Sequence, residues 1–204
     1  MWELFQAGGP VMWPLLLCSV VSLTVVLERI YYWLRLDLDK DKENIELLLR
    51  DVRAGKNSET GAKEGSLIFT MLMEGCAHPG PSASKAMEAV AIDAIAEMRR
   101  GMPVLDTIIT IAPMLGILGT VTGIIASFDM LGQAGVEDPR AVVSGIAEAL
   151  ITTATGLSIS VATVFPYNYF NSRIDAAQDK MDAYGTRLEL AHDERSMAEK
   201  LSGE

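Results

Sequence analysis

Uncharged and mostly apolar residues gather into three long runs along the chain. The runs cover residues 4–27, 107–128 and 149–172, and they are 24, 22 and 24 residues long. A helix needs about 20 predominantly apolar residues to cross the hydrocarbon core of a membrane. The pattern therefore predicts an all-α membrane protein with three transmembrane helices.

A cleaved secretory signal is the other interpretation of the first run. Residues 1–10 contain no Lys or Arg, and the apolar core is longer than a signal peptide requires. The run is followed by Tyr-Tyr-Trp between Arg29 and Arg35, which is typical of an anchor at the membrane interface. We therefore expect a retained helix.

The polar segment between the first and second runs predicts three shorter helices. A charged helix is expected near residues 40–54 and a short apolar one over 66–76, with Gly- and Pro-containing breaks around them. Ser82 or Ser84 is a good N-cap for the third, whose helical apolar periodicity covers 85–98.

Two of the spans are expected to extend beyond the membrane as helices. The helix over 85–98 is expected to run directly into the second span, softened at Gly101 and Pro103. The tail, residues 174–200, is similarly expected to continue the third span as a cytoplasmic helix. These segments leave too little chain for a separate enzymatic domain.

Basic residues are distributed unevenly around the spans. Ten of the 17 Lys and Arg lie within residues 35–103 and five lie from Arg173 onward, whereas the loop before the third span holds only Arg140. The positive-inside rule then places the N-terminus and this loop outside and the two basic segments in the cytoplasm. The predicted layout is an outer segment with transmembrane helix 1 (1–34), a cytoplasmic helical segment (35–103), transmembrane helix 2 (104–129), an outer loop (130–140), transmembrane helix 3 (141–170) and a cytoplasmic helical tail (171–204).

Composition changes this picture little. Half of the residues are hydrophobic, and the net charge of −10 is spread over both polar segments, which describes solvated helix faces and makes nucleic acid an unsuitable partner. Cys18 and Cys76 lie in different environments, so we expect free thiols.

Glu148 is an acid in a stretch, residues 141–172, that is otherwise uncharged. An ionisable group in a span is costly and marks a functional site by default. At about 100° per residue, Thr152 and Thr155 share its helix face, while Thr153 is turned aside. The other interpretation is a carboxylate solvated near the outer interface, because Glu148 lies only about 10 Å along the helix from the start of the span.

Small residues recur every three or four positions in both later spans. Such stripes let two helices approach closely, and ordinary helix packing is sufficient to explain them. A proline within the second span, Pro113, is expected to kink that helix. The glycines expected at the helix contact are Gly116, Gly119, Gly123, Gly145 and Gly156.

Two sequences in these spans resemble a known family. APMLGILGTVTGII, residues 112–125, and SGIAEALITTATGLSISVATVFPYN, residues 144–168, are similar to the two signature helices of the MotA/TolQ/ExbB proton channel family. The first span with its trailing ERIYYWLR, residues 28–35, fits as well, so the resemblance covers essentially the whole chain. The short chain and the sequences GIAEAL and GTVTGI are most similar to the ExbB branch, whereas MotA-type proteins usually have a fourth span and a longer cytoplasmic region.

The resemblance implies roles for three residues. Glu148 matches the family's glutamate in the third helix, Thr153 the pore-side threonine of that helix, and Thr120 the pore-side threonine of the second. Thr152 and Thr155 are added as candidates from the shared face. Two roles for Glu148 stay open: it tunes the pKa of a partner's aspartate by like-charge proximity, or it relays protons.

The resemblance also implies an assembly. In the family these helices line the lumen of a homopentamer in the bacterial inner membrane, with the N-terminus periplasmic and the C-terminus cytoplasmic. The lumen holds a dimer of ExbD- or TolR-like single-span partners, whose membrane aspartate takes up and releases the proton. A TonB- or TolA-like protein carries the work to the outer membrane. Besides these proteins, only membrane lipid is expected as a partner.

Other classes of function fit the sequence less well. No GxxxxGK phosphate loop occurs, which argues against ATP as the energy source, and a secondary transporter would need repeats or more spans. A purely structural scaffold would leave Glu148 unexplained. The spans hold no His and no acid pair, so we expect neither an enzyme nor a bound metal or cofactor. Within the family, TonB-dependent transport, a TolQ-like role in envelope integrity or division, and gliding-type motility all remain open.

Overall fold

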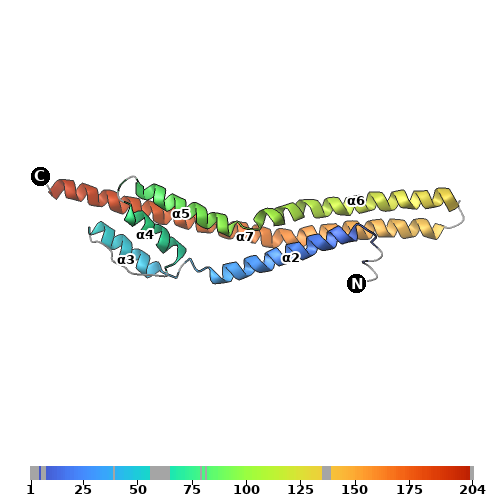
Figure 1. Ribbon diagram of the computed structural model, residues 1–204, viewed down its shortest axis with the longest axis horizontal. Coiled ribbons are helices and arrows are strands. Elements are labelled where there is room, and N and C mark those ends of the chain that lie inside the picture. The colour runs from blue at the N-terminus through green and yellow to red at the C-terminus, as the bar shows by residue number, and fades with distance from the viewer. Residues whose placement is uncertain are drawn as a thin grey trace. The chain divides into compact units, whose positions relative to one another are not determined.

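The structure is a computed structural model, which describes residues 5, 8–38, 40–55, 65–78, 80, 82–134 and 139–202. Every regular element within these residues is a helix, which confirms the all-α prediction (Figure 1). In chain order the helices are α2 (Met12–Arg35), α3 (Lys42–Arg53), α4 (Leu67–Ala77), α5 (Ser82–Met98), α6 (Met102–Ala134) and α7 (Pro139–Ser202).

Three stretches of helix are long and apolar enough to cross a membrane, as the sequence predicted. They lie within Met12–Arg35, Ser82–Asp129 and Gly145–Met197. Many of their large apolar side chains are exposed on the single chain, among them Leu17 at 65% and Phe165 at 72%. Exposed apolar surface on this scale is costly in water, and lipid or other membrane helices would cover it.

The chain divides into two compact units, which share α2 and α7. Unit 1 consists of residues 1–31 and 101–170, and unit 2 of residues 32–100 and 171–204. The long helix α7 contributes its first part to unit 1 and its remainder to unit 2. The expected helical continuation of the third span is therefore present.

The expected continuity between the helix over 85–98 and the second span is wrong. Helix α5 ends at Met98 and α6 begins at Met102, with a turn between them. Gly101 takes a φ of +79° in this turn. This backbone conformation ends a helix, and residues other than glycine rarely adopt it. Helix α5 also begins at Ser82, so this serine is its first residue rather than the preceding cap.

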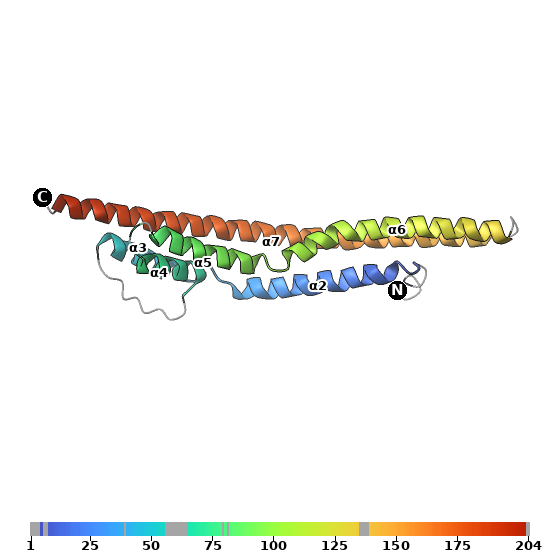
Figure 2. The same ribbon diagram turned by 45° about the horizontal axis from the view of Figure 1, so that its top comes forward.

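Unit 1 is a three-helix arrangement of α2, α6 and the first part of α7, in which α6 and α7 lie side by side (Figure 2). Its small core joins Met12 and Leu15 of α2 to Ile108 and Ala112 of α6, with Ile159 of α7 packed against them. A buried hydrogen bond of 2.7 Å joins the hydroxyls of Ser22 and Thr163, tying α2 to α7. Polar contacts of this kind hold membrane helices together, since lipid offers no hydrophobic driving force between them.

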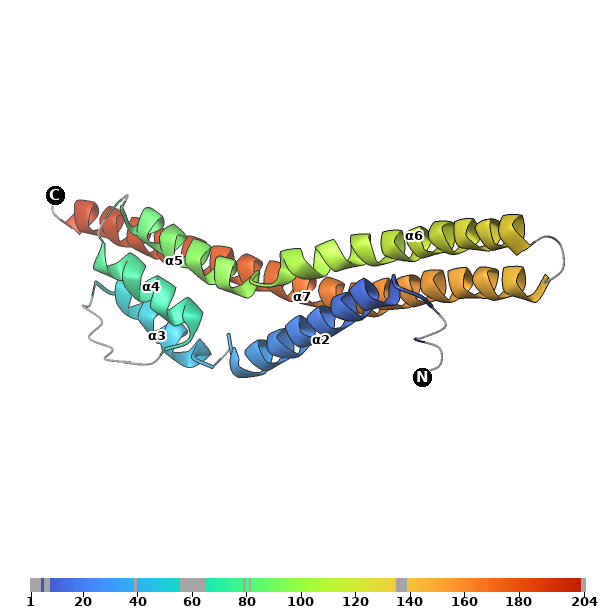
Figure 3. The ribbon, with the colours of Figure 1, turned by 45° about the vertical axis from the view of Figure 1, so that its right-hand side comes forward.

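Unit 2 packs α3, α4 and α5 against the C-terminal part of α7 (Figure 3). The buried face of α3 carries Ile45, Leu48, Leu49 and Val52. Two ion pairs tie α3 to α7: the Arg187 guanidinium donates to both oxygens of Glu46 at 2.8 and 3.3 Å, and Arg53 lies 3.2 Å from Glu194. Both pairs are exposed, so the apolar face supplies most of the stability.

Both cysteines are free, as the sequence predicted. Cys76 lies in α4 of unit 2, outside the spans, and is half-buried. Burial raises the pKa of its thiol, because the thiolate is poorly solvated there.

Candidate functional site

The two later spans meet along their glycines. A Cβ on Gly116 would lie 3.0 Å from Cα of Thr153, and one on Gly123 would lie 3.1 Å from Cβ of Ala149. At Gly119, Gly145 and Gly156 a Cβ would collide with atoms of the facing helix: Thr152 Oγ1, Ser127 Oγ and the carbonyl oxygen of Ala112, respectively. All five glycines of the sequence-predicted stripes thus lie at the contact between α6 and α7.

Thr120 and Thr153 meet at the centre of this contact. Their hydroxyls are hydrogen-bonded to each other across the two helices. Thr153 also donates to the carbonyl oxygen of Gly116 at 2.9 Å, and Thr120 lies 3.3 Å from the carbonyl oxygen of Ala149. Both threonines are half-buried on the single chain. Each hydroxyl is at once a donor and an acceptor, so the pair can exchange partners without losing a hydrogen bond.

The other two candidate threonines bond mainly to their own helix. Thr152 is only 1% exposed, and its hydroxyl donates to the carbonyl oxygen of Ala149 at 2.8 Å. Thr155 donates to the carbonyl oxygen of Ile151 at 2.8 Å and lines an apolar groove together with Leu15 and Ser19 of α2. The structure therefore brings Thr152 to α6 and Thr155 to α2.

Glu148 lies apart from the threonine pair, against the segment that leads into α2. Its side chain is half-buried and comes so close to Gly9 that a Cβ there would collide with the carboxylate oxygen. Gly9 has a φ of +66°, so a side chain would be disfavoured there on two counts. Among the residues that the structure describes, none forms a hydrogen bond or ion pair with the Glu148 carboxylate.

Sequence reasoning missed the part that Gly9 plays. The available signal was a Gly-Gly-Pro sequence, residues 8–10, immediately before the first apolar helix. Such a sequence predicts a turn, but it does not show which side chain packs against that turn. Only the packing of α2 against α7 brings Gly9 to Glu148.

Pro113 and Ser160 form a second arrangement that the sequence did not reveal. Pro113 lies inside α6 and has no N–H, so the carbonyl of Ile109 lacks its usual donor four residues on. The hydroxyl of Ser160 on α7 donates to this carbonyl oxygen at 2.8 Å. A serine of a neighbouring helix thus satisfies the group that proline leaves unpaired, as the apolar membrane interior requires.

We expect Ser160→Ala to destabilise the protein by about 1–2 kcal/mol, because it leaves that carbonyl without a donor. Ser158→Ala is the matched control, since Ser158 is exposed and donates to Ala154 of its own helix. Thermal unfolding of the two variants in the same detergent measures the difference. Equal stabilities would show that Ser160 contributes nothing to the proline-containing part of α6.

The structure describes no candidate metal centre. Among the described residues, no three His, Cys, Asp or Glu side chains are grouped so that they could hold a metal ion. The polar groups at the contact between α6 and α7 are hydroxyls and backbone carbonyls, and the carboxylate of Glu148 lies apart from them. Such groups can pass or bind protons and accept hydrogen bonds, and they offer no nucleophile paired with a base.

Three apolar helices of membrane length and a hydroxyl-bearing contact between two of them define a multi-pass membrane protein. Residues 66–183, more than half of the chain, match the MotA/TolQ/ExbB proton channel family. The chain therefore belongs to the MotA/TolQ/ExbB proton channel family. The resemblance noted in the sequence is confirmed.

Curated relatives carry ExbB names. The chain is 38% identical to ExbB-like biopolymer transport protein 1 of Synechocystis sp., over 93% of this chain and 78% of that protein. It is 31% identical to an ExbB homologue of Methanothermobacter thermautotrophicus, over 88% of this chain and 66% of the relative. Biopolymer transport protein ExbB of Xanthomonas campestris is 35% identical over a shorter stretch, 45% of this chain and 36% of the relative.

Proposed function

We propose that this chain is a subunit of an inner-membrane proton channel that works as a stator with an ExbD-like single-span partner. Proton flow through the complex would be converted into work that energises TonB-dependent transport across the outer membrane. The names of the relatives support the ExbB assignment. One charge that crosses a potential of 100 mV releases about 2.3 kcal/mol, which is enough to bias a two-state membrane element.

The observation that carries the proposal is the hydroxyl pair of Thr120 and Thr153. It lies between two helices that contain stretches of membrane length, within the part of the chain that matches the family. In a ring of five subunits, as the resemblance implies, α6 and α7 would face the lumen. The pair could then donate to a partner's aspartate when it is ionised and accept from it when it is protonated.

The same proposal assigns an orientation and roles to the remaining parts. Residues 35–103 and 171–204 would be cytoplasmic, and the N-terminus and the loop at 130–140 periplasmic, because Lys and Arg are concentrated in the first two segments. Glu148 would act near the periplasmic end of α7. Its half-buried carboxylate without an ion pair among the described residues supports a functional rather than a structural charge.

The test is proton uptake by liposomes that contain this chain together with its single-span partner, driven by a potassium diffusion potential and followed with an internal pH dye. We expect the double variant Thr120→Val and Thr153→Val to lower the uptake rate about ten- to a hundredfold, because two hydrogen bonds to a charged group are lost. The complex should still assemble, since hydrogen bonds between membrane helices contribute only about 0.6 kcal/mol each on average.

Thr122→Val is the matched control. Thr122 lies on the same helix as Thr120, but it is exposed and donates to the carbonyl oxygen of Leu118 in its own helix at 3.0 Å. It should therefore leave the uptake rate unchanged. If the assembled double variant takes up protons at the wild-type rate, the proton path does not run along the contact between α6 and α7.

A further inference from the structure

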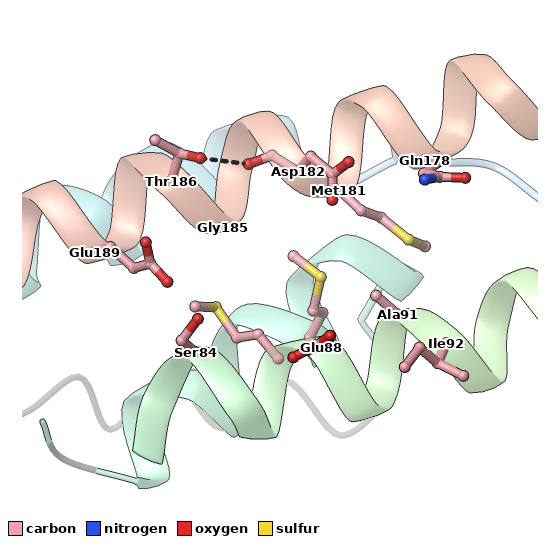
Figure 4. Close-up of a pocket in the computed structure, with 12 residues that line it drawn as sticks. Ser84, Glu88, Ala91, Ile92, Gln178, Met181, Asp182, Gly185, Thr186 and Glu189 are labelled. Atoms are coloured by element: carbon pink, nitrogen blue, oxygen red, sulfur yellow. Dashed lines mark hydrogen bonds between the residues drawn. The ribbon is translucent and has the colours of Figure 1, made fainter. Parts of the chain in front are cut away.

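Unit 2 contains a groove that the proton-channel function does not use. It lies between α5 and α7 and has a volume of about 450 Å³ (Figure 4). Its α5 wall runs from Ser84 to Ile92 and its α7 wall from Gln178 to Glu189. The lining positions recur every three or four residues on both helices, so each wall is one continuous helix face.

The floor and the rim of the groove differ in chemistry. Three buried methionines form the floor: Met71, Met87 and Met181. The other lining residues include three acids: Glu88, Asp182 and Glu189. Within the described part of the chain no Lys, Arg or His lines the groove, and none of these carboxylates forms an ion pair. An adaptable apolar floor below uncompensated negative charge suits a ligand that is both apolar and basic.

Gly185 lies in the α7 wall, and no close packing contact requires a glycine at this position. A Cβ at this position would meet no atom within 4 Å, so neither the fold nor a close helix contact requires its absence. A glycine inside a helix is less favourable than an alanine at the same position. This cost is compatible with a groove that needs an uncovered stretch of wall for the close approach of another backbone.

We propose that this groove is a docking site for a basic amphipathic helix of another polypeptide. The α7 wall from Gln178 to Glu189 extends over about 16 Å at 1.5 Å per residue, which matches about three turns of a docked helix. Apolar side chains of that helix, spaced three and four residues apart, contact the methionines, and its Lys or Arg residues pair with the acids. Ile92, which is 58% exposed, offers a further apolar contact at the end of the α5 wall.

The test uses the full chain in nanodiscs of phosphatidylcholine, a neutral lipid that does not itself attract a basic peptide. The probe is a fluorescein-labelled 18-residue peptide of Leu and Lys with leucines at helical spacing, and its binding is followed by fluorescence anisotropy. We expect saturable binding that weakens as salt is raised. A scrambled peptide of the same composition should bind at least about tenfold more weakly, because it has no continuous apolar face.

Two variants and one charge-matched control test whether the peptide binds in the groove. The triple variant Glu88→Gln, Asp182→Asn and Glu189→Gln should weaken binding about tenfold. A control with the same change in charge, Asp93→Asn, Asp175→Asn and Asp193→Asn, alters exposed acids of α5 and α7 outside the groove and should bind like the wild type. Gly185→Leu fills open space, so it should block binding while the protein keeps its thermal stability.

Three outcomes would overturn the proposal. The first is equal binding of the scrambled and the helical peptide, which would indicate non-specific charge attraction. The second is equal weakening by the groove variant and the charge-matched control. The third is that the wild type does not bind the peptide; a change in the mass of the assembly with Gly185→Leu in native mass spectrometry would then show that a second copy of the chain covers the groove.

Discussion

Glu148→Gln is expected to lower proton-driven uptake about a hundredfold while the subunit still assembles. The substitution keeps the size of the side chain and removes its ability to carry a proton, and a positioned acid or base contributes about 10²–10⁴ to a proton-transfer rate. Assembly should survive, because the carboxylate forms no ion pair or hydrogen bond with the described residues.

The pH dependence of the liposome assay separates the two roles proposed for Glu148. A relay would lose rate at every pH. A carboxylate that only tunes a partner's aspartate would leave the maximal rate intact, and its removal would shift the pH profile to lower pH, by about one unit for a tenfold change in proton affinity. Asp129→Asn is the control, since Asp129 is exposed at the end of the second span. If Glu148→Gln shows the wild-type proton uptake rate at all pH values, Glu148 has no role in the mechanism.

Gly156→Ala is expected to destabilise unit 1 by about 1–3 kcal/mol, the range of overpacked cores. The new Cβ would collide with the carbonyl oxygen of Ala112 on α6, and backbone cannot move aside as a flexible side chain does. The two helices would have to separate at a contact that also holds Thr153 close to Gly116. The thermal unfolding temperature in detergent should fall by about 5 °C, given about 2–4 °C per kcal/mol for a chain of this size.

The same substitution elsewhere in α7 is the control. Gly185→Ala should raise stability by about 0.5–1 kcal/mol, because its Cβ meets nothing and alanine favours a helix. The two substitutions are expected to change stability in opposite directions. The comparison therefore distinguishes the effect of alanine on helix propensity from its effect on the contact between α6 and α7. A stabilising Gly156→Ala would mean that α6 and α7 do not approach closely at this position.

The three spans were predictable because length and hydropathy are local properties of the chain. A run of more than 20 uncharged residues has no stable place other than a membrane or a large core. Local signals also predicted a short apolar helix over residues 66–76, where the structure has α4; its N-cap, Ser66, accepts a hydrogen bond from the amide of Phe69 and was not predicted as a cap. Sequence reasoning located the weak point at Gly101 but expected one softened helix, whereas a positive φ at this residue separates two helices.

The candidate site was predictable only in part. Glycines and threonines at helical spacing pointed to a contact face on each span, and Glu148 was visible as an isolated acid. Their partners were not visible, because the rotation and the register of one helix against another depend on side chains from all three spans. Gly9 and Ile109 are remote in sequence from Glu148 and Ser160, which they meet in the fold.

Hydropathy, spacing and motif were thus enough to establish the family and the three membrane helices, because each is written in a contiguous stretch of residues. Tertiary structure decided that Thr120 pairs with Thr153, that Glu148 lies against Gly9, and that α5 and α7 leave a groove between them. These features arise where segments that are remote in sequence meet. A polar group in an apolar contact must find its hydrogen bond there, and only the packed helices show which group supplies it.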